Sequence, residues 1–541
     1  MKPLTDNSSN FFKGALILTA AALVTKILSA IYRVPFQNIV GDVGFYIYQQ
    51  VYPFYGMILV LSTYGFPVAV SKLYSERKNS GTHEEAVRVL AASFIFLSIL
   101  GVILFSALYY GADWLAGKMG DPELALLLRV AAVPFLFIPF VSVLRGYFQG
   151  SGNMVPTAYS QVGEQFVRVV TILGLASLFI KEGYNLYYAG AGAAFGSVSG
   201  GLISIIILGL LFKRERRDNQ SNVTVTQLLK GSSNIIKALF IHGLSLSISA
   251  MLLIFLQMAD SLNLYSLLLS NGTMTEEAKA AKGIYDRGQP LIQLGTILST
   301  SMALSLIPLI ANARLKKQTS FVTEHISLAL KINILFGTGA ALGLLSIIEP
   351  VNEMLFEDRQ GSQVLAVLCF VILGGSAVMT LTSILQGLGS ILYPAAMVLI
   401  AFVLKLLLNL VFVPWLGTMG SAISSVLSCF LVLVLLGIKL RVKIKVSLLS
   451  PLYLVKVAGS ALLMVSFLFI YQNYTEFFYS LLVNDRLASA FQSISAAIFG
   501  GFIYIFALLR TSALSKKELS MLPFGSRLAF LLPKKTGGNH L

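Results

Sequence analysis

The sequence is dominated by long apolar stretches, each long enough to cross a lipid bilayer. A spanning helix needs about 20 predominantly apolar residues, and fourteen such stretches lie along the 541-residue chain. Their approximate bounds are 14–33, 45–70, 88–110, 124–145, 155–180, 187–212, 235–259, 288–311, 321–348, 363–386, 392–414, 418–438, 452–471 and 487–509. The composition, 56% apolar and 12% charged, fits no water-soluble domain. The sequence therefore predicts an all-α polytopic membrane protein with about fourteen transmembrane helices.

Positive charge is distributed unevenly between the two sets of loops. With the N-terminus inside, the inside segments hold 26 of the 40 Lys and Arg residues, and the outside segments hold seven. Cytoplasmic loops of membrane proteins carry such an excess. We therefore expect both termini in the cytoplasm, at the cell membrane. The net charge of +16 then reflects loops beside anionic lipid headgroups and indicates no nucleic-acid partner.

The chain also contains an internal repeat, with the second copy about 237 residues after the first. Matched positions are Ile47-Tyr48 with Ile284-Tyr285, Pro53 with Pro290, Gln149-Gly150-Ser151-Gly152 with Gln386-Gly387-Leu388-Gly389, and Arg168 with Lys405. A later match slips to a spacing of 228 and pairs Gly192, Ala194 and Ser197 with Gly420, Ala422 and Ser425. We expect two parallel six-helix bundles in a V shape, with a substrate site between them near the bilayer midplane. The predicted divisions are 1–212, a cytoplasmic linker at 213–234, 235–438, and 439–541 with two further helices and a basic tail.

Seven cations fall inside the apolar stretches, where charge is costly and normally faces a polar cavity. They are Lys26, Arg33, Arg129, Arg168, Lys331, Lys405 and Lys456. Few anions lie near them. Glu164 precedes Arg168 by four residues, a spacing that favours an ion pair on a helix, and Asp260 ends the seventh stretch. The surplus of positive charge predicts a cavity for an anionic substrate, because Arg binds phosphate through a bidentate fork and Lys as a point charge.

Two polar elements lie at the ends of the stretches. Asp286 and Arg287 precede the eighth stretch and form either an ordinary rim loop or a functional element, an outer gate or a contact with a headgroup. The two glycine-rich turns are each followed by a proline that opens the next helix. We interpret their residues as structural turns or hinges, and these residues are Gly150, Gly152, Pro156, Gly387, Gly389 and Pro394.

No motif for chemistry accompanies these features. The sequence contains no phosphate-binding loop of an ATPase, no His/Cys metal spacing and no nucleophile elbow. We therefore expect a transporter rather than an enzyme, with no cofactor or metal.

Several segments resemble the multidrug/oligosaccharidyl-lipid/polysaccharide exporter superfamily, and within it the polysaccharide-transporter branch that includes stage V sporulation protein B-like proteins and lipid II flippases. The segments are Thr25-Lys26-Ile27-Leu28, Tyr32-Arg33, Gly65-Phe66-Pro67-Val68-Ala69-Val70-Ser71-Lys72, Arg145-Gly146-Tyr147-Phe148-Gln149-Gly150, Met154-Val155-Pro156-Thr157-Ala158 and Ser160-Gln161-Val162-Gly163-Glu164-Gln165-Phe166-Val167-Arg168. In the lipid II flippases, basic residues of helix 1 and an Asp-Arg pair at helix 8 line the central cavity. Lys26, Arg33 (with a one-residue offset), Asp286 and Arg287 match these positions. The flippases' arginine after the proline matching Pro53 and the acidic residue early in their helix 2 have no counterpart here.

The resemblance implies a flippase that moves a polyprenyl-diphosphate-linked saccharide, a cell-wall or polysaccharide precursor, across the membrane by alternating access. The last two helices would then supply a lipid-facing groove for the polyprenyl tail. We expect the substrate-binding residues to be Lys26, Arg33, Arg168, Arg287 and Lys405, and the coupling carboxylates to be Glu164, Asp260 and Asp286. The driving force is H+, Na+ or the membrane potential. Two alternatives stay open: an ion-coupled multidrug/cation antiporter that depends on Glu164 or Asp260, and a scramblase-like or structural partner of cell-wall synthesis enzymes.

Overall fold

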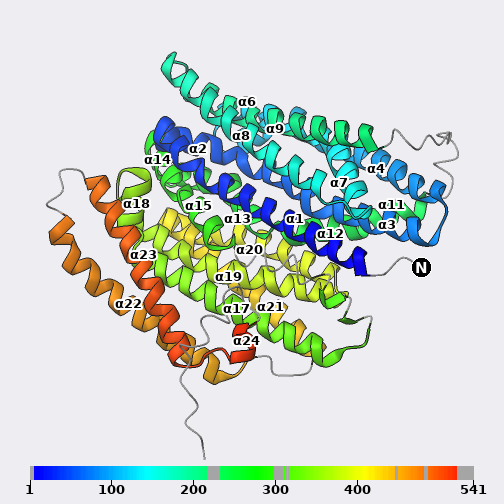
Figure 1. The fold of residues 1–541 in the computed structure, drawn as a ribbon. Coiled ribbons are helices and arrows are strands. Elements are labelled where there is room, and N and C mark those ends of the chain that lie inside the picture. Colours follow the sequence, from blue (N-terminus) through cyan, green and yellow to red (C-terminus); the bar gives the residue numbers. More distant parts are fainter. Residues whose placement is uncertain are drawn as a thin grey trace, which may run out of the picture. The chain divides into compact units, whose positions relative to one another are not determined.

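The described part of the chain is helical throughout. The structure, a computed structural model, describes residues 5–215, 232–297, 307, 309–311, 313, 314, 316–444, 449–479 and 485–520. Only the backbone is described for residues 5–16, 80, 83, 476–479, 517 and 520. Among these residues every regular element is a helix and none is a strand (Figure 1). Most of the predicted linker at 213–234, part of the predicted eighth span and the tail beyond residue 520 lie outside the described residues.

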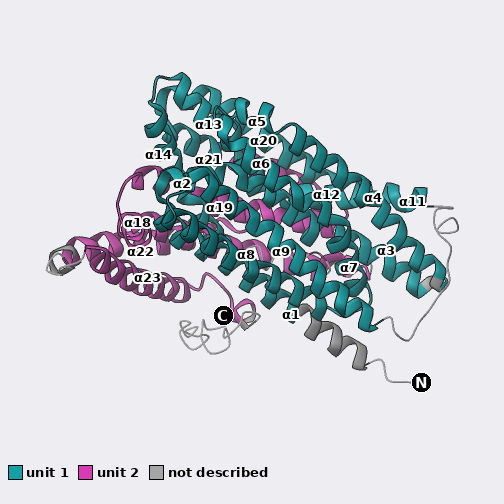
Figure 2. Ribbon diagram, turned by 90° about the horizontal axis from the view of Figure 1, so that it is seen from above, with its two compact units in different colours: residues 1–297, 390–428 teal, residues 298–389, 429–541 magenta. Residues whose placement is uncertain are grey.

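The helices belong to two compact units (Figure 2). Unit 1 comprises residues 1–297 and 390–428, and unit 2 comprises residues 298–389 and 429–541. The helices of unit 1 are α1 Thr5–Ile31, α2 Arg33–Val60, η1 Leu61–Gly65, α3 Phe66–Ser80, α4 His83–Tyr110, α5 Ala112–Lys118, η2 Pro122–Leu124, α6 Ala125–Ala132, η3 Val133–Phe137, α7 Ile138–Gly150, α8 Val155–Lys181, α9 Leu186–Glu215, α11 Ser233–Ala238, η5 Leu239–Gly243, α12 Leu244–Ala250, α13 Leu252–Ser270, α14 Thr275–Asp286, α15 Gly288–Gly295 and α20 Leu392–Leu416. Helix α21, Thr418–Ile444, passes from unit 1 into unit 2. Unit 2 also holds α17 Thr319–Ser346, α18 Ile348–Phe356, α19 Ser362–Gly387, α22 Pro451–Tyr479, α23 Asp485–Arg510 and α24 Lys516–Ser520.

The prediction of a polytopic all-α membrane protein is confirmed. Thirteen helical segments of the described residues are long and apolar enough to span a bilayer. The count is one lower than fourteen because the predicted eighth span, 288–311, lies partly outside the described residues and is not among the thirteen. Two other differences cancel each other in the count. The first two predicted spans form one continuous segment, Ile17–Asn79, and the predicted seventh span is divided at Met251 into two. The division into units does not follow the proposed repeat, whose boundaries stay a prediction.

Helix α2 contains the bend that separates the first two predicted spans. Gly41 has φ +67° and ψ −176°, a conformation that few residues other than glycine adopt. Further along, η1 is a π-helix, in which the backbone hydrogen-bond ladder is shifted. Such segments are frequent at functional sites. Both irregularities flank the part of α2 that carries the polar residues described below.

In unit 2 the C-terminal segment is tied to α17 and α22. Lys331 Nζ lies 2.6 Å from Glu518 Oε1, and the Tyr453 hydroxyl donates to the Lys331 carbonyl at 2.5 Å. Lys456 donates to the Ser512 carbonyl at 3.1 Å. Burial alone would raise the pKa of the Glu518 carboxyl, but hydrogen bonds from Lys331 and Ser515 outweigh it and hold this pKa below its ordinary value. The contacts provide a partner for Lys331, one of the seven cations within the spans.

We predict that Glu518→Gln lowers the thermal stability of the purified protein. The loss at pH 7 should be about 1.5–3 kcal/mol, the range for a hydrogen bond that involves a charged group. A lowered pKa in the folded state adds stability above the ordinary value of 4.5, and this stability disappears as the pH falls through the folded-state pKa. The difference in melting temperature between wild type and variant should therefore shrink below pH 4.5. Lys516→Gln, an exposed change in the same helix, is the control; an equal loss in both variants would contradict the assignment.

Candidate functional site

Arg168 of α8 is surrounded by tyrosines in the core of unit 1. Its side chain is completely buried. Arg168 Nη2 donates to the hydroxyls of Tyr32 at 3.1 Å and Tyr48 at 2.8 Å, and these two hydroxyls are 2.8 Å apart. The guanidinium carbon lies 3.9 Å from the ring centre of Tyr55. We call Arg168, Tyr32 and Tyr48 the Arg168 site.

A second arginine, Arg33 at the start of α2, lies in the same cluster and is 1% exposed. Its guanidinium carbon is 4.2 Å from the ring centre of Tyr52, and Arg168 also faces this ring at 5.6 Å. Tyr48, Tyr52 and Tyr55 are spaced by four and three residues on α2, which places them on one helix face.

Neither guanidinium has a carboxylate partner among the described residues. The Nε and Nη1 groups of Arg33 and the Nε group of Arg168 are buried and make no hydrogen bond there. A cation–π contact contributes about 0.5–2 kcal/mol, whereas burying an ion costs several kcal/mol. The tyrosines therefore offset only part of this cost, and the cluster is suited to receive an anion.

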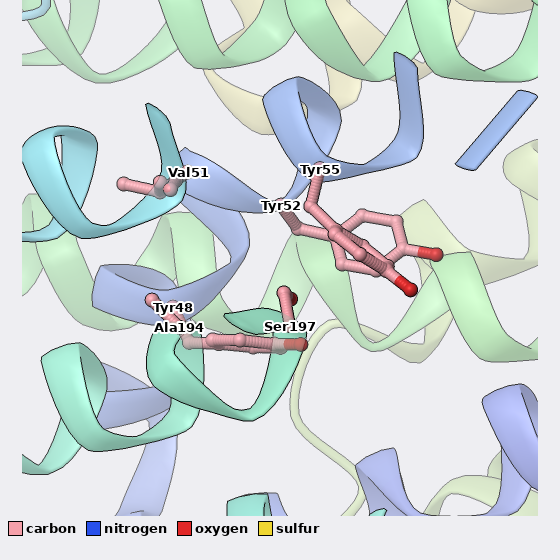
Figure 3. Close-up of a pocket in the computed structure, with 7 residues that line it drawn as sticks. Tyr48, Val51, Tyr52, Tyr55, Ala194 and Ser197 are labelled. Carbon is pink, nitrogen blue, oxygen red and sulfur yellow. The ribbon is translucent and has the colours of Figure 1, made fainter. Parts of the chain in front are cut away.

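A small cavity adjoins this cluster. It is lined by Tyr48, Val51, Tyr52, Tyr55, Ala131, Ala194 and Ser197. Figure 3 shows the tyrosines of α2 and Ser197 of α9 around it. The rings of Tyr52 and Tyr55 are 6.2 Å apart and inclined by 60°. Three of the seven lining residues are tyrosines, and one of them, Tyr48, accepts a hydrogen bond from Arg168.

Glu164 does not pair with Arg168, so that expectation is wrong. Its Oε2 accepts a hydrogen bond from Arg145 Nη2 of α7 at 2.8 Å, and its Oε1 accepts one from the Tyr55 hydroxyl at 3.4 Å. Arg145 is fully buried and also donates to Ser62 O in the π-helix η1 at 3.1 Å. It makes further bonds to Thr63, Ser160 and Ser204. Arg145 of α7 thus links η1, α8 and α9, and the helical spacing was misleading because another helix supplies the cation.

Lys405 of α20 has the counter-ion that Arg168 lacks. Its Nζ lies 2.5 Å from Asp260 Oδ2 and 2.6 Å from Ser425 Oγ, and both ionic side chains are 1% exposed. Asp260 Oδ2 also accepts a hydrogen bond from the Tyr285 hydroxyl at 2.9 Å. Its other oxygen accepts bonds from Ser421 at 2.6 Å and Asn409 at 3.2 Å. We call Lys405, Asp260 and Tyr285 the Lys405 site. In this structure Lys405 is therefore no unpaired cation, unlike the expectation for a substrate-binding lysine.

Asp286 and Arg287 are neighbours in sequence but have separate partners. Asp286 pairs with Lys282 at 2.6 Å, one turn earlier on α14. Arg287 is fully buried and binds Asp42 of α2 through Nε and Nη2, at 2.7–3.0 Å. Gln37 supports the same carboxylate at 2.9 Å. The bidentate Asp42–Arg287 bond, which we call the latch, joins the two proposed repeats.

The two glycine-rich turns have the predicted turn geometry. Gly152 and Gly389 adopt φ +84° and φ +81°. A β-carbon on Gly150 would lie 2.8 Å from Ser71 O, and one on Gly387 would lie 2.9 Å from Ile310 Cβ. Pro156 and Pro394 lie in the first turns of α8 and α20. A role as hinges stays a prediction.

The structure thus brings together two of the five predicted binding cations, Arg33 and Arg168. Arg287 and Lys405 lie in ion pairs, and Lys26 is half-buried on α1. Sequence reasoning missed the partners Asp42, Arg145 and Lys282, and the tyrosines of α2. The three-and-four spacing of those tyrosines was a signal available in the sequence. Among the described residues, no group of three or more His, Cys, Asp or Glu side chains is placed to bind a metal.

Comparison with known proteins identifies the family. The sequence model described as "Polysaccharide biosynthesis protein" matches residues 11–314. A relative from Bacillus subtilis (strain 168), the uncharacterized membrane protein YabM, is 43% identical over 524 residues, which is 97% of each chain. The chain belongs to the polysaccharide biosynthesis protein family. Other relatives from the same organism are stage V sporulation protein B, 29% identical over 79% of this chain and 82% of the relative, and the lipid II flippase MurJ, 24% identical over 94% and 97%.

Solved structures show the same fold. An inward closed conformation of lipid II flippase MurJ matches with a TM-score of 0.64 at 15% identity, over 92% of this chain and all of that one. An inward-facing transporter of the multidrug resistance MATE family, from the MOP superfamily, matches with a TM-score of 0.63 at 18% identity, over 80% and 98%. The resemblance found in the sequence is confirmed by the family match and the relatives, and these structures show the shared fold. Family and fold together identify a multi-pass membrane transport protein and not an enzyme.

We predict that replacing both Arg145 and Glu164 lowers the stability of the protein by less than the two single substitutions do in sum. Glu164→Gln or Arg145→Met alone leaves an unpaired buried charge, which costs about 3–5 kcal/mol. The double variant removes both charges and should be less destabilised than the sum of the single variants. Thermal unfolding of the four purified proteins measures this difference, and strictly additive losses would show that the two groups do not interact.

Proposed function

We propose that the protein flips a polyprenyl-diphosphate-linked saccharide from the inner to the outer leaflet of the cell membrane by alternating access. The observation that carries the proposal is the pair of buried guanidinium groups, Arg33 and Arg168, with no carboxylate among the described residues. Membership of the polysaccharide biosynthesis protein family and the relationship to lipid II flippase MurJ support this substrate class. The excess of Lys and Arg in alternate loops supports cytoplasmic termini.

A diphosphate matches the chemistry of this cluster. It brings several negative oxygens on two adjacent phosphorus atoms, and arginine binds such groups through paired N–H donors. The unused donors of Arg33 and Arg168 are available for these bonds. Lys26 lies seven residues before Arg33, and we propose it as a third contact. Both arginines are closed off here, so the substrate must enter when the helices around them separate.

The latch supplies a gate for that movement. Asp42 and Arg287 join α2 to the α14–α15 junction, and Gly283 packs so closely on Asp42 that an added β-carbon would lie 2.1 Å from its carbonyl oxygen. With cytoplasmic termini, this end of the helices faces outward. We therefore assign the latch to closing the outer side, and opening requires its hydrogen bonds to break.

The Lys405 site is our candidate for energy coupling. Protonating Asp260 would leave Lys405 as an uncompensated buried cation, so the state of this pair and the conformation around it must change together. Glu164 and Asp286 are further candidates, each already paired with a cation. The same pairing disfavours a drug/cation antiporter, because binding a cationic drug at Glu164 or Asp260 would displace a buried cation from its carboxylate. Cell-wall synthesis enzymes enter this proposal only because they would act on the same lipid-linked substrate.

The first test is native mass spectrometry of the detergent-purified protein, in search of co-purified polyprenyl-diphosphate lipids. We expect such a lipid on the wild type and its loss from Arg33→Ala/Arg168→Ala, since each charged hydrogen bond contributes about 1.5–3 kcal/mol. Arg129→Ala is the matched control, because Arg129 also lies in a span of unit 1 but pairs with the exposed Asp113 at 2.5 Å. Retention of the lipid by the double variant would refute the proposed site.

A second prediction concerns the latch. Asp42→Asn should weaken it and increase hydrogen exchange of amides around residues 37–45 and 280–290, measured by mass spectrometry. The charge swap Asp42→Arg/Arg287→Asp should restore part of the protection. Asp113→Asn breaks an exposed ion pair and should leave exchange in these segments unchanged. Unchanged exchange in Asp42→Asn would remove the latch from the mechanism.

A further inference from the structure

The Arg168 site and the Lys405 site follow the same plan. Tyr48 and Tyr285 are 237 residues apart in sequence, and so are Arg168 and Lys405. In each site a buried cation and a tyrosine hydroxyl share hydrogen bonds with one further side chain. The serines near the two sites, Ser197 and Ser425, match at the repeat spacing of 228.

The shared third side chain differs in charge. In the first repeat it is Tyr32, whose hydroxyl lies 3.1 Å from Arg168 Nη2 and 2.8 Å from the Tyr48 hydroxyl. In the second repeat it is Asp260, whose Oδ2 lies 2.5 Å from Lys405 Nζ and 2.9 Å from the Tyr285 hydroxyl. Tyr32 lies between α1 and α2, at the end of the first predicted stretch, and Asp260 lies in α13, at the end of the seventh. A neutral hydroxyl therefore takes, in one copy, the place of a carboxylate in the other.

The difference in charge bears on which site needs an external counter-ion. The Lys405 site is internally neutral, whereas the Arg168 site is positive and has the equally unpaired Arg33 beside it. We propose that Tyr32 is the specificity-determining residue of the first repeat: by replacing a carboxylate, it leaves the counter-charge of Arg168 to be supplied by the diphosphate of the substrate. The inference rests on the proposed function and concerns the same site.

A tyrosine suits this position better than an apolar residue. Its hydroxyl accepts a hydrogen bond from Arg168 and keeps the guanidinium oriented while the site is empty. The bond from Arg168 to the Tyr32 hydroxyl has one charged member, whereas a bond to a phosphate oxygen pairs two opposite charges and can be bidentate, so a phosphate oxygen can replace the hydroxyl. A carboxylate in the same place would compete for the donors of Arg168 and repel the phosphate.

The test compares two variants that differ in charge and hardly in shape, Tyr32→Glu and Tyr32→Gln, in the purified full-length protein. The probe is farnesyl diphosphate, with farnesol as the uncharged control ligand, and the readout is the dissociation constant at pH 7.5. Tyr32→Gln should bind farnesyl diphosphate within about threefold of the wild type, and Tyr32→Glu at least about tenfold more weakly, because an internal carboxylate satisfies Arg168. Without ligand, Tyr32→Glu should melt at the same temperature as Tyr32→Gln or higher, which a merely damaged site would not show.

The controls separate this inference from the proposed function. If Arg33→Ala/Arg168→Ala binds the probe as the wild type does, the proposed function fails. If that variant loses binding while Tyr32→Glu and Tyr32→Gln bind equally, the inference alone fails. Tyr504→Phe, which removes a buried hydroxyl bonded to Leu335 O in unit 2, should bind normally. Should Tyr32→Glu not fold, the shorter pair Tyr32→Asp and Tyr32→Asn repeats the comparison with the same two outcomes.

Discussion

The cost of placing charge in a bundle of apolar helices governs the core of unit 1. A buried ion loses several kcal/mol of hydration, so each cation there must find a partner or have a functional reason to lack one. Arg145, Lys282, Arg287 and Lys405 meet this demand with Glu164, Asp286, Asp42 and Asp260. Arg33 and Arg168 have no carboxylate partner among the residues that the structure describes. Aromatic rings and hydroxyls surround them instead. The exception defines the candidate site more clearly than any motif does.

The overall architecture was predictable because bilayer thickness sets the length of an apolar run. The bends were not, since a helix that turns at Gly41 or Met251 keeps its backbone hydrogen bonds nearly continuous and leaves little trace in hydropathy. Charge within the spans was also visible in the sequence. Its pairing was not predicted, even where both members share a helix, as Lys282 and Asp286 do.

Long-range partners lay beyond such reasoning. Asp42 and Arg287 are 245 residues apart, and Asp260 and Lys405 are 145 residues apart. Glu164 and Arg168 had the right spacing for a bond, but Arg145 reached the carboxylate from α7 and the tyrosines of α2 surrounded the arginine. Local geometry permits a pair, whereas the packing of neighbouring helices decides whether it forms. The internal repeat predicted the location of the buried cations better than helical spacing did, since it matches Arg168 with Lys405.

The position of the bend in α2 has a mechanical consequence. Asp42 follows Gly41 directly, and Tyr48 lies six residues further on the same helix, a rise of about 9 Å. No other irregularity interrupts the helix between them. The stretch from Asp42 to Tyr48 is therefore one rigid helical segment, and Gly41 is the point about which it can rotate. A rotation that moves Asp42 away from Arg287 also moves Tyr48, and so changes the position of its hydroxyl beside Arg168. The latch and the Arg168 site therefore cannot move independently.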